Sequence, residues 1–302
     1  MRCTINDAQD PERQSADDPL PALRSAAATA ELRAEPATLV RYGSNAVFRL
    51  PDDVIARVSR PGASLSDARR QVDVARWLAD MNLPAVEVVD IPQPVAAANR
   101  VVTFWRSASD DETYADIADV ADLLRRLHQL QEPDRLELPV SQPFRSKLPP
   151  LDGLAEPDKS FLRERYDWAR ESFSQLPYAL PRGVIHGDAN VGNVIIGRDG
   201  RPLLIDLDSV SVGPREWDLV QTALFADRLG WHTAEEYARF VDVYGYDLRE
   251  WEGYEQLADM REIAMTAWLS TQAATSERSA REAAKRIAAI RTGACRRDWS
   301  PY

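Results

Sequence analysis

The segment 184–219 constrains this chain most, because it sets a dense group of polar side chains among short apolar runs. Asp188 follows a histidine and a glycine, Asn193 lies five residues later, and Asp206 is embedded in the apolar run LLIDL. An Asp-Gly pair precedes that run and is a hairpin signal, so two short strands are expected at 194–196 and 203–207. The spacing therefore predicts a small hairpin that brings three oxygen-bearing side chains together.

These residue types suit phosphoryl transfer. An aspartate, an asparagine five residues later and a further aspartate have the catalytic-loop and metal-ligand spacing of kinases. Asp188 can accept the proton of an attacking hydroxyl, while the oxygens of Asn193 and Asp206 are suitable Mg²⁺ ligands. Asp208 is expected to share the face of Asp206 if the strand continues. His186 is expected to be a hydrogen-bonded structural residue beneath the loop.

Hydrophobic periodicity divides the chain into an extension and two regions. Residues 1–30 form an N-terminal extension with a polar tail and a helix beginning near Leu20. Residues 31–106 predict a small antiparallel sheet with one helix, from Ser64 to about Met81. Its strands are expected at 38–40, 45–50, 54–58, 86–89 and 100–105. Residues 107–302 are mostly helical, with capping-box spacing at Thr233 and Asp247 and a helix stop at Gly293. The fold class is therefore α+β.

Composition excludes several kinds of partner. The 302 residues carry a formal charge of −11, so no nucleic-acid partner is expected. No apolar run approaches the ~20 residues of a membrane span, and the first residues are polar, so we expect a cytoplasmic protein with no membrane partner. Cys3 and Cys295 predict free thiols, and three histidines are too few for a site built from several imidazoles.

The chain resembles the aminoglycoside phosphotransferase and choline kinase-like superfamily, over about residues 38–270. The motifs that carry the resemblance are His186-Gly187-Asp188, Asn193, Ile205-Asp206-Leu207-Asp208 and Trp217-Asp218-Leu219, together with the segments 42–50, 101–105 and 124–128. The resemblance implies a protein-kinase-like bilobal fold, with a small antiparallel β-sheet N-lobe and a larger helical C-lobe. It also implies ATP or GTP bound between the lobes with Mg²⁺, and phosphate transfer to a hydroxyl of a small molecule.

By this resemblance Asp188 is the catalytic base, Asn193 and Asp206 are metal ligands, and Asp218 braces the loop. The residues expected to contact the nucleotide are Gly43, Ser44, Asn45, Arg57, Phe104 and Trp105. The turn at 43–45 can offer backbone N–H groups and a hydroxyl to phosphate oxygens.

The chain departs from the family pattern at the residues that hold the α- and β-phosphates. No lysine precedes Lys147, so the usual strand lysine is absent and Arg57 occupies its position. Arginine can bind two phosphate oxygens with its fork of donors. Gln71 falls where a glutamate is expected, and Asp67 and Asp73 are alternatives that we interpret rather as solvated surface acids.

The acceptor is expected to be a hydroxylated, cationic small molecule similar to an aminoglycoside, which would make the protein an antibiotic-resistance kinase. Asp259 and Glu262 share one helical face beside Met265 and Trp268, and could bind its amine. A choline-like amine, an amino alcohol or a sugar remains open as acceptor. A degenerate nucleotide-binding scaffold also remains open: the exchanges at Arg57 and Gln71 favour it, and the presence of all three polar loop residues argues against it.

A metal-dependent phosphoesterase is a further alternative. Two-metal sites of that kind need more histidines and carboxylates than the loop supplies. His128 and His232 are expected in helices unrelated to the loop.

Overall fold

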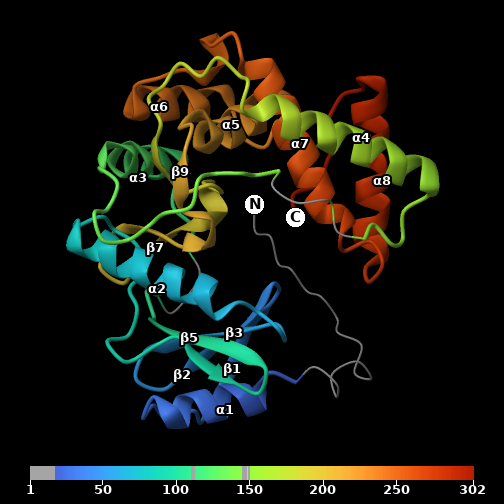
Figure 1. Cartoon of the computed structure of the whole chain (residues 1–302). Helices are drawn as coiled ribbons and strands as arrows, with labels where there is room; N and C mark the ends of the chain where they lie inside the picture. Colours follow the sequence, from blue (N-terminus) through green and yellow to red (C-terminus); the bar gives the residue numbers. More distant parts are fainter. Residues whose placement is uncertain (1–17, 110–112, 145–147, 149) are drawn as a thin grey trace. The chain divides into compact units, whose positions relative to one another are not determined.

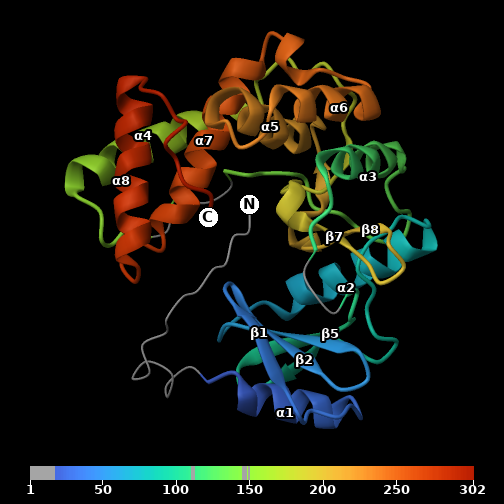
Figure 2. The same ribbon diagram turned by 180° about the vertical axis from the view of Figure 1, so that it is seen from behind.

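The structure is a computed structural model that describes residues 18–109, 113–144, 148 and 150–302. The chain separates into two compact units. The first contains Met1–Asp80 and Ala85–Asp110, and the second contains Met81–Pro84 and Asp111–Tyr302. Figures 1 and 2 show the first unit in blue to green and the second mainly in green to red.

The first unit is built on one antiparallel sheet of five strands in the order β1-β2-β3-β5-β4. The strands are β1 (Thr38–Tyr42), β2 (Asn45–Leu50), β3 (Val54–Ser59), β4 (Val95–Ala97) and β5 (Arg100–Arg106). Alternate residues along each strand face opposite sides of the sheet. Phe48, Ala56 and Phe104 therefore share one face, where they form an apolar core with α1 (Leu20–Thr29). The helix of the predicted extension thus packs on the sheet.

The second helix of this unit, α2 (Leu65–Asp80), lies on the opposite side of the sheet from α1 (Figures 1 and 2). Its apolar residues at helical spacing, such as Val72, Ala75 and Leu78, are buried. The bounds of α2 confirm the predicted helix to within a residue at each end.

The strand predicted at 86–89 is wrong. Val88 forms only an isolated bridge with Trp105, and β4 is the fifth strand instead. The reason is the side chain of Gln93, whose amide group forms hydrogen bonds with the backbone of β5 where a neighbouring strand would otherwise pair. Its Oε1 accepts from the backbone N–H of Phe104 at 2.8 Å, and its Nε2 donates to the carbonyls of Phe104 (3.1 Å) and Val89 (2.7 Å). A side chain that pairs with the backbone in this way replaces a regular ladder.

The second unit is mainly helical. Its α-helices are α3 (Ile117–Gln129), α4 (Glu156–Phe173), α5 (Glu216–Leu224), α6 (Ala234–Tyr244), α7 (Tyr254–Ser270) and α8 (Glu277–Thr292). Short helical turns lie at η2 (Val191–Asn193), η3 (Leu207–Ser209) and η5 (Leu248–Glu250), and a π-helix, η4 (Phe225–Leu229), extends α5. Two antiparallel strand pairs complete it: β6 (Gly183–Ile185) with β9 (Ser211–Gly213), and β7 (Val194–Ile196) with β8 (Pro202–Leu204).

The helix ends follow local sequence rules. Thr233 and Glu236 form the predicted capping box, and Gly293 ends α8 with a positive φ. The capping box expected at Asp247 is not formed. The Asp247 carboxylate accepts instead from Arg249 N and from the hydroxyl of Tyr237, and only the short turn η5 follows.

The core of the second unit is built around α5, whose nine residues are all buried. Because α5 begins three residues after β9, its first turn places Trp217 and Asp218 behind the loop that follows β6. Within the described residues, no helix combines the length and apolar character needed to cross a bilayer.

Candidate active site

The loop after β6 carries the motif His186-Gly187-Asp188, and its path depends on the glycine. Gly187 has φ of +86°, and a Cβ at this position would lie 2.6 Å from the carbonyl oxygen of Ser209 in η3. The left-handed conformation and the close approach both exclude a side chain here. The arginine that protein kinases carry at this position does not fit this loop.

Asp218 braces the loop from behind, as the family resemblance implied. Its Oδ2 accepts from the backbone N–H of His186 and its Oδ1 from that of Gly187, each at 2.7 Å. Nε2 of His128 lies 3.0 Å from the same Oδ2. Although burial of the carboxyl acts to raise it, these partners hold the pKa of Asp218 below its ordinary value. Asp218 is thus a buried carboxylate whose charge fixes the turn of the loop.

Two histidines support this arrangement. His186 is fully buried with Nε2 2.9 Å from the carbonyl of Ile205, which agrees with the structural role predicted for it. The prediction that His128 is unrelated to the loop is wrong, because this residue contacts Asp218 from α3. His232 lies in the loop before α6 and not in a helix, and burial lowers its pKa. His128 ends the family-like segment 124–128, which was the available signal in the sequence, whereas His232 belongs to no such motif.

Asp188 carries a hydrogen bond on each carboxylate oxygen. Nη2 of Arg261 donates to Oδ1 at 2.5 Å, and Nδ2 of Asn193 donates to Oδ2 at 3.2 Å and to the Asp188 carbonyl at 2.7 Å. The Asp188 side chain is 47% exposed, whereas that of Arg261 is 8% exposed. The carboxylate therefore has a fixed orientation and still faces solvent, as a group that receives a proton must.

The predicted metal ligands come together through the β7–β8 hairpin. The backbone N–H of Ile205 donates to the carbonyl of Asn193 at 3.0 Å, which places Asp206 next to Asn193. The Asn193 amide nitrogen donates to Asp188, so the amide oxygen takes no part in that bond. One amide and one carboxylate oxygen fit Mg²⁺, which keeps waters and phosphate oxygens as its other ligands. Among the described residues, no group of three or more His, Cys, Asp and Glu side chains is placed so that it could hold a metal ion.

Asp208 does not share a strand face with Asp206, so that expectation is wrong. Strand β8 ends at Leu204, and Asp206 adopts the left-handed conformation with φ 60° and ψ 58°. Asp208 then lies in the helical turn η3. The alternation of a strand does not extend through a left-handed residue.

The turn between β1 and β2 in the first unit contains Gly43 and Ser44. Gly43 N donates to the carbonyl of Asn45 at 3.0 Å, and Arg60 donates to the carbonyl of Gly43 at the same distance. Ser44 is exposed, and a Cβ at Gly43 would have no atom within 4 Å. The turn is thus closed by its own hydrogen bonds with an open outer side.

Arg57 and Phe104 lie on opposite faces of the sheet. Arg57 pairs with Thr103, and its guanidinium lies 5.8 Å from the ring centroid of Trp105, on the face away from α1. Phe104 pairs with Ala56 and is fully buried in the core with α1. Its backbone groups bond to Gln93 and Val89. The Phe104 side chain is therefore not exposed to contact a nucleotide on the face of Arg57, because alternate residues of a strand face opposite sides of the sheet. Its backbone N–H already donates to Gln93.

The acids on α2 behave as solvated surface residues. Asp67 pairs with Arg70 at 2.7 Å and Asp73 with Arg76 at 3.7 Å, each one helical turn further on. Gln71 lies half-buried between them in sequence. Asp67 and Asp73 are therefore paired within α2 and do not replace the negative charge that a glutamate at the position of Gln71 would carry.

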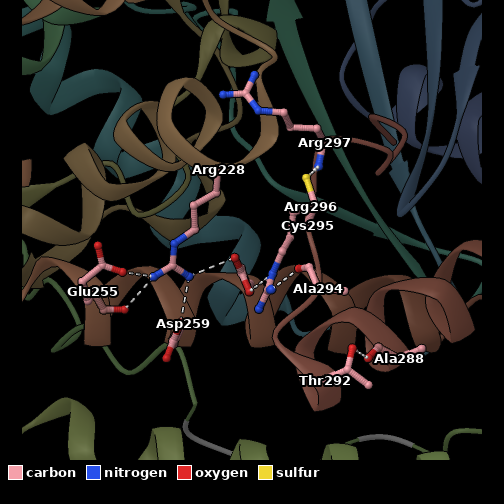
Figure 3. Close-up of polar contacts among 10 residues, drawn as sticks. Arg228, Glu255, Asp259, Ala288, Thr292, Ala294, Cys295, Arg296 and Arg297 are labelled. Atoms are coloured by element: carbon pink, nitrogen blue, oxygen red, sulfur yellow. Dashed lines mark hydrogen bonds and ion pairs between the residues drawn. The ribbon is translucent and has the colours of Figure 1, made fainter.

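Asp259 and Glu262 share one face of α7, and both are ion-paired. Figure 3 shows Asp259 beside Arg228. Arg228 Nη1, from η4, lies 2.7 Å from Asp259 and 3.0 Å from Glu262. Glu262 is 1% exposed and also pairs with Arg296, at 3.2 Å. Burial acts to lower the pKa of Arg228, but its carboxylate partners raise it above the ordinary value. Glu262 is thus a compensated buried charge, while the side chain of Asp259 remains 44% exposed.

Asp259 lines a cavity of about 440 Å³ in the second unit. The cavity is bounded by η4, α7 and the segment that follows α8, and its lining includes Asp227, Arg228, Asp259, Cys295, Arg296 and Arg297. Figure 3 shows Arg228, Asp259, Cys295, Arg296 and Arg297 of this set. Trp268, which was expected beside these acids, is 56% exposed further along α7. Two carboxylates from different helices therefore face one space.

Three features together are those of a kinase-like phosphotransferase: a braced His-Gly-Asp loop, an amide and a carboxylate joined by a hairpin, and a five-stranded sheet with a helix on each side. The model of the phosphotransferase enzyme family matches residues 39–258, and the chain belongs to this family. The enzyme is a small-molecule phosphotransferase with an alcohol group as acceptor.

Solved structures share the fold, which confirms the kinase-like architecture expected from the resemblance. An amicoumacin kinase in complex with AMP-PNP and Ca²⁺ is 15% identical, with a TM-score of 0.70 and coverage of 97% of this chain and 98% of that one. An aminoglycoside phosphotransferase from Streptomyces rimosus is 20% identical, with a TM-score of 0.58 over 81% and 96% of the two chains. A choline/ethanolamine kinase family protein from Mesorhizobium loti is 18% identical, with a TM-score of 0.62 over 90% and 92%. No curated protein sequence matches the chain.

Proposed function

We propose that the protein transfers the γ-phosphate of ATP or GTP to a hydroxyl of an amine-bearing small molecule, with Asp188 as the base. The observation that carries this proposal is the pair of donors, Arg261 and Asn193, that orient a half-exposed Asp188 carboxylate. A carboxylate held in this way can align an acceptor hydroxyl for in-line attack.

The reaction forms one bond and breaks one. The acceptor oxygen bonds to the γ-phosphorus, the bond from that phosphorus to the β–γ bridging oxygen breaks, and the hydroxyl proton passes to Asp188. The nucleoside diphosphate leaves with the electron pair of the broken bond. A Mg²⁺ ion held by Asn193 and Asp206 would neutralise charge on the phosphates.

In the first unit we assign the phosphate contacts to the Gly43–Asn45 turn and to Arg57. The open side of the turn suits phosphate oxygens, and the packing of Arg57 near Trp105 limits the positions that the guanidinium can adopt. Two similar structures support a purine nucleotide as donor: the amicoumacin kinase in complex with AMP-PNP, and a spectinomycin phosphotransferase in complex with ADP.

The test is the Asp188→Asn variant, with Asp199→Asn as a matched control. Asp199 lies in the exposed turn of the β7–β8 hairpin and contacts Arg201. Product formation is followed by ADP or GDP release over a panel of hydroxylated amines, antibiotics and sugars. Asp188→Asn is expected to lower kcat by about 10²–10⁴ with little change in nucleotide affinity, because the carboxylate acts on the acceptor. If the Asn variant keeps more than about a tenth of kcat, Asp188 is not the base.

A nucleotide-binding scaffold without turnover is the second candidate, and the neutral Gln71 favours it, since its neighbours Asp67 and Asp73 are engaged by arginines. Nucleotide binding without phosphate transfer to any acceptor of the panel would support this candidate. Phosphate transfer that Asp188→Asn abolishes would exclude it.

For the acceptor we propose a cation bound at Asp259, with Asp227 across the same cavity. Of the two acids Asp259 and Glu262, Asp259 is the better one to mutate. Removing the buried Glu262 carboxylate would leave the charges of Arg228 and Arg296 less compensated and would destabilise the fold. Asp259→Asn should raise KM for the acceptor more than it lowers kcat, and rising salt should weaken binding. The control is Glu164→Gln, on the exposed side of α4. A phosphorylated product without an amine, or an unchanged KM in Asp259→Asn, would rule out this acceptor site.

A further inference from the structure

Arg261 lies on α7, 73 residues from the loop that it contacts. Its guanidinium is buried beside the ring of Trp217, 4.9 Å from the ring centroid. Nη2 donates to Asp188 Oδ1 at 2.5 Å and also to the Oε1 of Gln221. One nitrogen of this guanidinium therefore joins α7, α5 and the catalytic loop.

The contact between Arg261 and Asp188 matters for stability because the Arg261 guanidinium is buried. A guanidinium removed from water needs a compensating charge and filled donors. Nε of Arg261 is buried and has no hydrogen-bond partner among the described residues, so Nη2 carries the polar contacts that the structure shows. Asp188 is the carboxylate that compensates the charge of Arg261.

We propose that Arg261 is a positioning residue for the base Asp188. Arg261 holds Oδ1 from α7 while Asn193 holds Oδ2 from η2, so two elements fix the plane of the carboxylate. The exposed lone pairs then point to the acceptor side in one orientation. This inference rests on the proposed function, in which Asp188 receives the acceptor proton.

The same helix carries the proposed amine contact. Asp259 lies two residues before Arg261, so the two side chains leave α7 on different faces, one toward Arg228 and the other toward Asp188. We therefore expect different kinetic effects of the two residues. Substitutions at Asp259 should change the affinity for the acceptor, whereas substitutions at Arg261 should change kcat.

The kinetic test compares Arg261→Met, Arg261→Lys and the control Arg286→Met. Arg286 is also buried, pairs with Glu282 at 3.0 Å and packs on Trp299, but it lies on α8. The probe is MgATP alone, with water as phosphate acceptor, followed by ADP release; the acceptor identified by the screen is the second probe.

Arg261→Met should lower kcat about tenfold or more, because small displacements of a reacting group cost up to about 10²-fold. The dissociation constant of MgATP should change less than about threefold, and Arg261→Lys should recover part of kcat, since it keeps the charge. Arg286→Met should lower the midpoint of thermal unfolding without lowering kcat. Equal kcat in Arg261→Met and the wild type would overturn the proposal, and so would a loss that Arg286→Met shares.

A double-mutant cycle tests the contact without any turnover. Asp188→Asn should lower the midpoint of thermal unfolding, because Arg261 is then left buried without a counter-charge. Adding Arg261→Met should give back part of this loss, whereas strictly additive losses would show that the two side chains do not interact.

The cycle separates failure of the inference from failure of the proposed function. If Asp188→Asn keeps its turnover, the proposed base is wrong whatever the cycle shows. If Asp188→Asn loses turnover and Arg261→Met does not, only the positioning role of Arg261 is wrong.

Discussion

Nε2 of His128 lies 3.0 Å from Oδ2 of Asp218, and both side chains are buried. The contact joins α3 to α5 behind the catalytic loop, across 90 residues of sequence. Because the same carboxylate holds the N–H groups of His186 and Gly187, the loop is anchored to two helices of the second unit.

Replacing Asp218 with alanine should destabilise the protein strongly. The change leaves two buried N–H groups, of His186 and Gly187, without an acceptor, at about 1–3 kcal/mol each. The free energy of unfolding in urea measures the loss. Asp122→Ala on the exposed side of α3 is the control, for which about 0.5 kcal/mol or less is expected. Equal losses in the two variants would contradict the anchoring role.

The Asp218 carboxyl should also make stability depend on pH in the acid range. Its pKa in the folded protein lies below the ordinary value of 3.8. The charged form is therefore favoured by folding, and its contribution is complete above about pH 4 and is lost as pH falls through the lower folded value. Urea unfolding of the wild type and Asp218→Asn between pH 6 and pH 3 measures this. The stability difference between them should shrink below about pH 4, and a constant difference would contradict the assignment.

Substitutions at the proposed metal ligands should change the requirement for divalent ions. Asn193→Ala and Asp206→Ala each remove one proposed oxygen ligand, so the Mg²⁺ concentration for half-maximal activity should rise. We expect a rise of about tenfold or more, which corresponds to a loss of about 1.4 kcal/mol in the free energy of ion binding. Asn193→Ala should in addition lower kcat, because its amide holds Asp188. Asp199→Ala on the same hairpin serves as control. Unaltered titrations in both variants would remove these residues from the metal site.

Arg57 should determine nucleotide affinity. Arg57→Ala removes a cation aimed at phosphates and should weaken ATP binding, whereas Arg57→Lys keeps the charge and should be better tolerated. Arg24→Ala, on α1 at the other face of the sheet, should leave the affinity unchanged. Binding of a fluorescent ATP analogue gives the three dissociation constants. The reverse order, with lysine worse than alanine, would show that Arg57 does not contact phosphate.

Local signals predicted most of the fold and the part of the site that lies within one segment. The hairpin around Gly200 depends on turn chemistry, and the α2 helix on apolar spacing, so both could be recognised from neighbouring residues. The end of β8 could not, because the left-handed conformation of Asp206 depends on its surroundings and not on its apolar neighbours. Likewise, the sequence predicts a strand at 86–89 beside β5, because apolar alternation does not reveal that the Gln93 side chain bonds to the backbone of Phe104.

The contacts between residues far apart in the sequence could not be predicted from the sequence. His128 and Arg261 meet the loop only through tertiary packing. The segment 124–128 marks His128 as part of a family-like helix but not its partner, and no such motif includes Arg261. Arginine is mostly a surface residue, so a buried one is recognised only when its partner is known. The ion pairs of Asp259 and Glu262 with Arg228 were missed in the same way.

The close approach at Gly187 has a mechanical consequence. At this point the loop that carries Asp188 runs close to the backbone and Cβ of Ser209, three residues beyond Asp206, with no room for a side chain at Gly187 between them. Backbone in van der Waals contact cannot yield as a flexible side chain does. We therefore expect the loop that carries Asp188 and the turn that follows Asp206 to shift together, so that a displacement at the proposed metal site would be felt at the proposed base.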